Sequence, residues 1–144
     1  MRNVGLLALR VAVGVVFVYH GWGKLAAIDQ TAGFFASQGF PLAVFFAWLV
    51  GLVEFLGGLA VLFGFYLRAA AKSLAVVMLV ALLVVHTRAA WGMAELPLVL
   101  FGACLALLET GGGDWMVSTK DCACKLCGGA NACECGKGGS CGCK

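Results

Sequence analysis

Seven of the eight cysteines of this 144-residue chain stand close together near its C-terminus, in a pattern that suits metal or thiol chemistry. They are Cys122, Cys124, Cys127, Cys133, Cys135, Cys141 and Cys143. Thiolates bind soft ions such as Cu(I) and Zn²⁺, and the glycines between them let a short chain wrap around an ion. An odd number of cysteines fits a disulfide framework poorly. The cluster therefore predicts a Zn²⁺ or Cu(I) site, or a redox-sensitive thiol tail without a dedicated metal.

Two further residues are charged although the sequence around them is apolar. Arg10 and Glu54 each interrupt a long hydrophobic run, and a charge at the centre of a bilayer costs roughly 2.5–3.5 kcal/mol. Counted from the expected helix ends, both lie at a similar depth in neighbouring antiparallel helices, so we expect an Arg10–Glu54 ion pair. Glu54 shares one helix face with Ala47, Gly51 and Gly58, and such a face of small residues predicts close packing against another helix. The pair would either form a polar site for a proton, a quinone headgroup or a small solute, or only fix the helix register.

More ionisable residues are expected near one end of the helices. His20 and Lys24 are four residues apart and share a helix face. His86 and Arg88 end a later apolar run, and Glu95 opens the next one. These side chains either converge in one polar vestibule or extend separately to water at the membrane surface. Haem held by the two histidines is not expected, because His86 stands at a helix end.

The elements that must position these residues are membrane-spanning helices. Hydrophobic residues make up 62% of the chain and charged residues only 12%, whereas a soluble domain has about 25% charged residues. Spans of about 20 apolar residues are expected near 4–21, 42–66, 69–86 and 91–109, with a short helix at the membrane surface around 31–36. The predicted fold class is therefore an all-α membrane protein, a bundle of four transmembrane helices.

The chain divides into two parts where its composition changes. Residues 1–115 are expected to form the four-helix part, and residues 116–144 a Cys-rich, largely irregular tail with too few apolar residues for a core.

Five Lys and Arg residues flank the spans on the side of the two termini, against two on the other side, which predicts cytoplasmic termini. Cleavage of the first span as a signal peptide is not expected, because Arg10 interrupts it. The expected partner is the lipid bilayer, and a net charge of only +3 gives no reason to expect nucleic acid.

Several short motifs in the first 121 residues resemble the DoxX family in their order and spacing. They are Leu9-Arg10, the run from His20 to Leu25, the run from Glu54 to Gly58, Glu95, and the run from Thr110 to Trp115. The resemblance implies a four-helix bundle in the inner (plasma) membrane of a prokaryote, associated with membrane redox systems. The family's charged positions then correspond to Arg10, His20, Lys24, Glu54 and Glu95. The cysteine tail, whose C-x-C pairs resemble metallothionein, departs from the family pattern and suggests a metal or thiol specialisation.

Three functions follow from these features. The first is a redox-associated membrane subunit that handles a quinone or proton in the bundle and thiols or bound metal in the tail. The second is transport, buffering or resistance for metals such as copper and zinc. The third is a non-enzymatic assembly or docking partner in which the ion pair is only structural. A bundle this small has little room for a buried cofactor, so we expect a homo-oligomer or a larger membrane redox complex.

Overall fold

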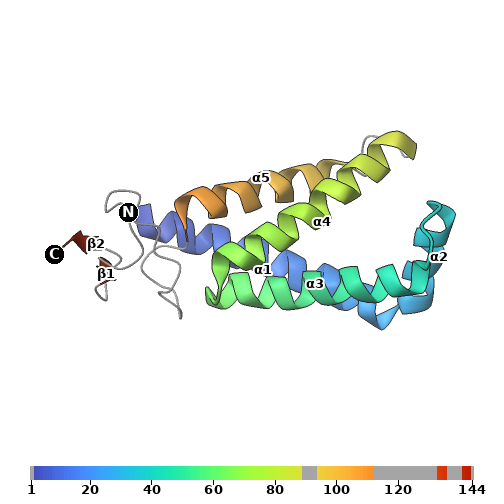
Figure 1. Ribbon diagram of the computed structural model, residues 1–144, viewed down its shortest axis with the longest axis horizontal. Helices are drawn as coiled ribbons and strands as arrows, with labels where there is room; N and C mark the ends of the chain where they lie inside the picture. Colours follow the sequence, from blue (N-terminus) through green and yellow to red (C-terminus); the bar gives the residue numbers. More distant parts are fainter. Residues whose placement is uncertain (1, 89–93, 112–132, 136–140, 144) are drawn as a thin grey trace.

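The chain forms a bundle of helices and a small two-stranded ribbon in its computed structural model (Figure 1). The structure describes residues 2–88, 94–111, 133–135 and 141–143, with side chains for 4–84 and 94–111. The helices are α1 (Arg2–Ala26), α2 (Ile28–Ser37), α3 (Ala43–Phe63), α4 (Leu67–Arg88) and α5 (Glu95–Thr110). The strands β1 (Cys133–Cys135) and β2 (Cys141–Cys143) pair antiparallel. The expected boundary between bundle and tail, at 115/116, lies outside the described residues.

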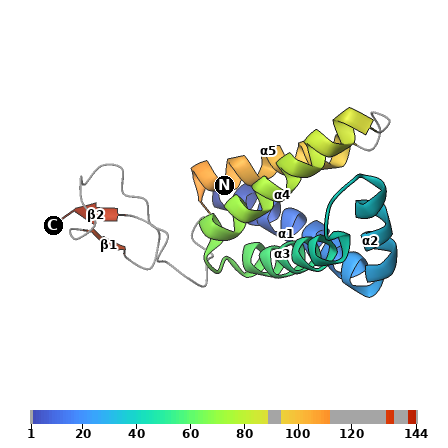
Figure 2. The same cartoon turned by 45° about the vertical axis from the view of Figure 1, so that its right-hand side comes forward.

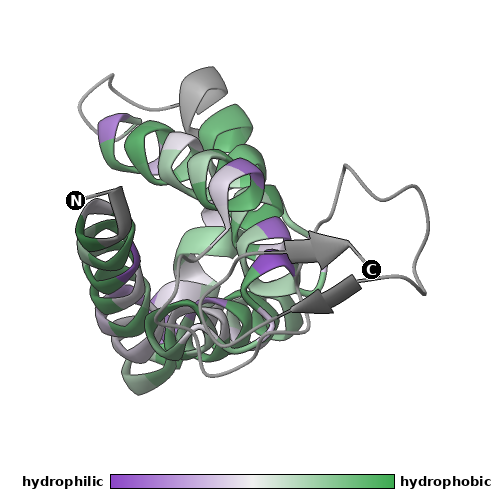
Figure 3. Ribbon diagram, turned by 90° about the vertical axis from the view of Figure 1, so that its left-hand side faces the viewer, coloured by the Kyte–Doolittle hydropathy of each residue, from purple (hydrophilic) through white to green (hydrophobic). Residues whose placement is uncertain are grey.

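Three of the helices are long and apolar enough to cross a membrane. These candidate spans are Val4–Ala26, Ala43–Phe63 and Leu67–Val84, and hydrophobic residues dominate the helices (Figure 3). α5 occupies most of the fourth expected span, but its 16 residues extend over only about 24 Å, and a hydrocarbon core is roughly 30 Å thick. The described residues up to 111 therefore form an all-helical membrane protein with three candidate spans.

The helices are arranged as two antiparallel pairs. α1 packs along α3, and α4 packs along α5, while α2 crosses one end of the first pair (Figure 1). The two pairs meet near the start of α1 and separate toward α2, as both views show (Figures 1 and 2). A buried core that includes Val13, Phe17, Val61, Leu74 and Cys104 joins them. The end near α2 is where a cavity forms between the pairs.

The first pair is tight because small residues line its contact. α3 buries the face predicted from the sequence, with Ala47, Gly51, Glu54 and Gly58, and adds Val61. A Cβ atom on Gly21 would lie 2.4 Å from the backbone nitrogen of Phe55, and one on Gly58 would lie 2.8 Å from that of Val18. Side chains cannot fit at such distances from backbone atoms, so only glycine allows this approach. The predicted small-residue packing face is confirmed.

Three helix ends differ from the sequence prediction. α1 runs to Ala26 instead of ending near Gly21, because Gly21 packs against α3 and the helix continues past it. α3 ends before Tyr66, because Gly64 adopts a left-handed conformation with φ 69° and ends the helix. α2 is ten residues long, longer than the expected helix at 31–36. The longer α1 places its last turn beside the middle of α3.

Candidate ligand cavity and its ion pair

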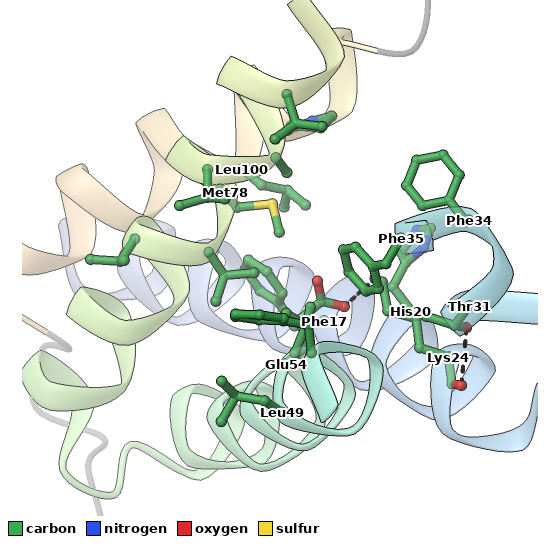
Figure 4. A pocket seen from close by; sticks show the side chains of 18 of the residues that line it. Phe17, His20, Lys24, Thr31, Phe34, Phe35, Leu49, Glu54, Met78 and Leu100 are labelled. Carbon is green, nitrogen blue, oxygen red and sulfur yellow. Dashed lines mark hydrogen bonds and ion pairs between the residues drawn. The ribbon is translucent and has the colours of Figure 1, made fainter. Parts of the chain in front are cut away.

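An ion pair with a buried carboxylate joins α1 to α3. The ammonium of Lys24, in the last turn of α1, donates a hydrogen bond to Oε2 of Glu54 in α3 (Figure 4). The Glu54 side chain is only 2% exposed, whereas that of Lys24 is 30% exposed. A buried carboxylate needs a partner of this kind, because an unpaired charge loses its hydration without compensation. Lys24 therefore stabilises the charge on Glu54 while part of its own side chain remains accessible.

Arg10 is buried elsewhere, and the expected Arg10–Glu54 pair is wrong. The Nε of Arg10 donates to the backbone oxygen of Val61 at 3.3 Å, and its Nη2 donates to that of Leu62 at 3.2 Å. Both carbonyls belong to the last turn of α3, where the helix dipole is negative. The Val61 oxygen also accepts a hydrogen bond from the capping Gly64 N–H at 3.2 Å, so Arg10 adds to the capping of this end. Arg10 thus supports the C-terminal end of α3, and Glu54 takes its cation from the opposite end of α1.

The helix register explains this correction. Gly21 packs against Glu54 and Phe55, so Glu54 lies beside the C-terminal part of α1. Arg10 lies at the level of Val61, seven residues further along α3, which is about 10 Å along the helix axis. The depth count from the sequence failed because it ended α1 near Gly21 and so placed both charges at the same level.

A cavity of about 510 Å³ lies between the two helix pairs, and the ion pair forms part of its wall (Figure 4). This volume is within the range of roughly 300–1,000 Å³ that is typical of small-molecule sites. The polar residues of the wall are His20, Lys24, Thr31 and Glu54, all from α1, α2 and α3. The side chains contributed by α4 and α5 are Val76, Val77, Met78, Val80, Ala81, Val84, Leu96, Pro97 and Leu100, all of them apolar. The cavity therefore suits a molecule with one polar end and an apolar body.

Phenylalanines form the rim of the cavity near α2. Phe34, Phe35, Phe40 and Phe46 line it, and successive ring centroids along this series are 6.0, 5.4 and 5.6 Å apart. Such spacing is typical of favourable aromatic contacts. Sequence reasoning missed these residues, although the dipeptides at 34–35 and 45–46 were a visible signal. They line a cavity only because the α1–α3 and α4–α5 pairs separate at this end of the bundle.

The structure brings only part of the second expected group together. His20 and Lys24 both line the cavity beside Glu54, and the exposed His20 ring makes an edge contact with Tyr19 at 5.6 Å. Glu95 begins α5, is exposed, and is not among the described residues that line the cavity. His86 and Arg88 lie at the end of α4, and their side chains are outside the described part.

The cysteines fall into three different situations. Cys104 is a buried free thiol in the core of α5. Cys122, Cys124 and Cys127 lie outside the described residues. Cys133 and Cys135 form the ends of β1, and Cys141 and Cys143 those of β2. The predicted metal or thiol role of the tail stays a prediction.

Comparisons with known proteins find one matching family and relatives that share about a third of the sequence. A sequence model of the family described as DoxX matches residues 5–87. The chain is 34% identical over 121 residues to “Inner membrane protein YqjF” of Escherichia coli, which covers 81% of this chain and 92% of that protein. It is 33% identical over 110 residues to “Putative oxidoreductase CatD” of Bacillus subtilis, covering 76% of this chain and 81% of that protein. No solved structure matches the chain.

Proposed function

This chain belongs to the DoxX family of membrane proteins, and we propose that it acts as a redox-associated subunit that binds a quinone headgroup beside Glu54. The observation that carries the proposal is the apolar cavity of about 510 Å³ with one ion pair in its wall. The name of one relative, “Putative oxidoreductase CatD”, supports the redox assignment. The name of the relative YqjF supports an inner-membrane location.

A quinone fits the chemistry of the cavity better than a sugar does. Its ring and isoprenoid tail are apolar and suit the walls from α4 and α5, and planar rings pack well against the phenylalanine rim. Its carbonyl oxygens accept hydrogen bonds, and the donors available at the polar wall are Lys24 and His20. A sugar would leave many hydroxyl groups without partners in such a site.

Each polar residue has a distinct role in this proposal. A bound quinone accepts two electrons and two protons to become a quinol. Lys24 donates a hydrogen bond to one carbonyl oxygen and so orients the headgroup. As the two electrons arrive, the Glu54 carboxylate relays one proton from water to the same oxygen, and a second proton reaches the other carbonyl oxygen by way of His20, which also lines the cavity. The electrons come from a redox partner, so the chain works in a larger membrane complex. Within that complex the chain is present as one copy or as a homo-oligomer.

Headgroup recognition can be tested with two matched ligands. A quinone with a decyl tail and decylbenzene, which lacks the oxygens, are titrated against protein in lipid nanodiscs. Because one hydrogen bond to a charged group contributes about 1.5–3 kcal/mol, wild type should prefer the quinone by roughly 10- to 100-fold. Lys24→Met should remove this preference and leave decylbenzene binding unchanged. Lys72→Met is the control, because Lys72 is exposed on α4 and does not line the cavity.

Proton transfer is tested separately from binding. Glu54→Gln keeps the shape of the side chain and removes its charge, so quinone binding should persist while quinone-linked electron transfer in native membranes is lost. Equal protein levels and an intact helical spectrum would exclude misfolding. Equal affinity for both ligands, or full electron transfer in Glu54→Gln, would overturn the proposal. The docking alternative would then be favoured if partners still co-purify in mild detergent.

A further inference from the structure

The two short strands of the tail bring four cysteines together. β1 and β2 pair in a register in which Cys133 lies opposite Cys143 and Cys135 lies opposite Cys141. Positions two apart in a strand belong to the same face of a sheet. All four cysteine positions therefore share one face of the ribbon, and the residue pair between them belongs to the other face.

The backbone spacing of these positions matches a site for one ion. Opposite Cα atoms of an antiparallel pair are about 4.5–5.5 Å apart, and Cα atoms two residues apart along a strand are about 6.8 Å apart. The four positions thus form the corners of a small rectangle. A tetrahedral ion with metal–sulfur bonds of about 2.3 Å is of the right size for four cysteines in such an arrangement.

We propose that Cys133, Cys135, Cys141 and Cys143 form a tetrathiolate site for one divalent ion of the Zn²⁺ type. Four sulfur ligands in a tetrahedral set are typical of structural zinc sites, which are closed to further ligands. The four thiols lose their protons when the ion binds, so binding strengthens as the pH rises. The ion would hold the two strands together in a segment that has too few apolar residues for a core.

The remaining cysteines of the tail do not complete a second site of this kind. Cys122, Cys124 and Cys127 supply three sulfurs, and a closed zinc site needs four ligands. The proposal therefore divides the seven cysteines into four ligands and three others. This division distinguishes it from a cluster in which all seven cysteines share several ions.

The test uses the full-length protein in detergent, stripped of metal under reducing conditions and titrated with Zn²⁺. Elemental mass spectrometry should find one zinc per chain, and Co²⁺ in its place should give the visible spectrum of tetrahedral thiolate coordination. The double variant Cys133→Ser/Cys143→Ser should bind zinc more than about 100-fold more weakly, because even the loss of an outer partner of a metal ligand weakens binding 10–100-fold. The matched control Cys122→Ser/Cys124→Ser should keep one zinc with unchanged affinity.

Each other outcome would overturn the proposal. Zinc loss in both variants would indicate a cluster of the whole tail, and iron in place of zinc would indicate an iron–sulfur centre. Absence of metal together with four fewer free thiols would indicate two cross-strand disulfides. The result is independent of the quinone proposal, because all variants keep Lys24 and Glu54 and should bind the decyl quinone like wild type.

Discussion

The Lys24–Glu54 pair makes a sharp prediction about stability. Lys24→Met removes the cation and leaves the Glu54 carboxylate, whose side chain is 2% exposed, without its partner. Breaking a fully buried pair in this way costs about 3–5 kcal/mol. Because the Lys24 side chain is 30% exposed and lines the cavity, the pair is only partly buried, and we expect a smaller loss of about 2–3 kcal/mol in the free energy of unfolding. This lowers the folding equilibrium constant roughly 30- to 150-fold.

The double variant tests whether the two residues act as a pair. Glu54→Leu alone leaves Lys24, which can reach solvent, so it should cost only about 1 kcal/mol. Replacing both members of a buried pair by apolar residues is often neutral, so Lys24→Met/Glu54→Leu should be within about 1 kcal/mol of wild type. The coupling energy of the double-mutant cycle should then be at least about 2 kcal/mol. Equilibrium unfolding in mixed micelles, followed by circular dichroism, measures it.

Arg10 provides the matched control for this cycle. Arg10 and Glu54 differ in level by about 10 Å along the axis of α3, and residues so far apart usually contribute additively. Arg10→Met combined with Glu54→Leu should therefore give the sum of the single effects within about 0.5 kcal/mol. Strong coupling in the Arg10 cycle, or additivity in the Lys24 cycle, would refute the pairing seen in the structure.

Three further predictions follow from the packing, the cavity and the charge pattern. Gly21→Ala should lower the free energy of unfolding by about 2 kcal/mol, because the added Cβ would meet the backbone of Phe55. Gly23→Ala is the control: the space around Gly23 is open, so this variant should be neutral or stabilising in the same unfolding assay. Ala81→Trp should fill the cavity and weaken decyl quinone binding at least about tenfold; Leu79→Trp, on an exposed position outside the described lining, should bind normally. The tail cysteines should react with a membrane-impermeant maleimide only after cells are permeabilised, and labelling of intact cells would contradict cytoplasmic termini.

The packing faces of the helices could be predicted from the sequence because they depend on local spacing. Ala47, Gly51, Glu54 and Gly58 recur at intervals of three and four residues, and such intervals define one side of a helix whatever the helix contacts. A small-residue face in a membrane helix predicts a close helix neighbour. The structure confirms this face and its partner, α1.

The ion pair could not be predicted by the same means. Pairing depends on the level of each residue along the helix, and a helix end misplaced by a few residues moves that level by several ångströms. Sequence patterns locate helix ends only within two to four residues, and α1 continues past the expected end at Gly21 to Ala26. The cavity could not be predicted from the sequence either, since it exists only because the α4–α5 pair separates from the α1–α3 pair.

The two cations of α1, buried Arg10 and partly exposed Lys24, have different roles, and this difference indicates what the cavity binds. Arg10 uses its fork of donors on two carbonyls of α3, a geometry that a lysine could not reproduce. Lys24 is a single flexible charge at the cavity wall, and its charge is balanced by Glu54.

A ligand with a carboxylate or phosphate would bring a second anion beside Glu54, with one ammonium to share between them, in a site whose other walls are apolar. A neutral headgroup with an acceptor oxygen needs only a hydrogen bond from Lys24 and leaves the pair intact. The arrangement therefore favours a neutral, ring-shaped acceptor such as a quinone over the fatty acids and phospholipids that surround the protein in the membrane.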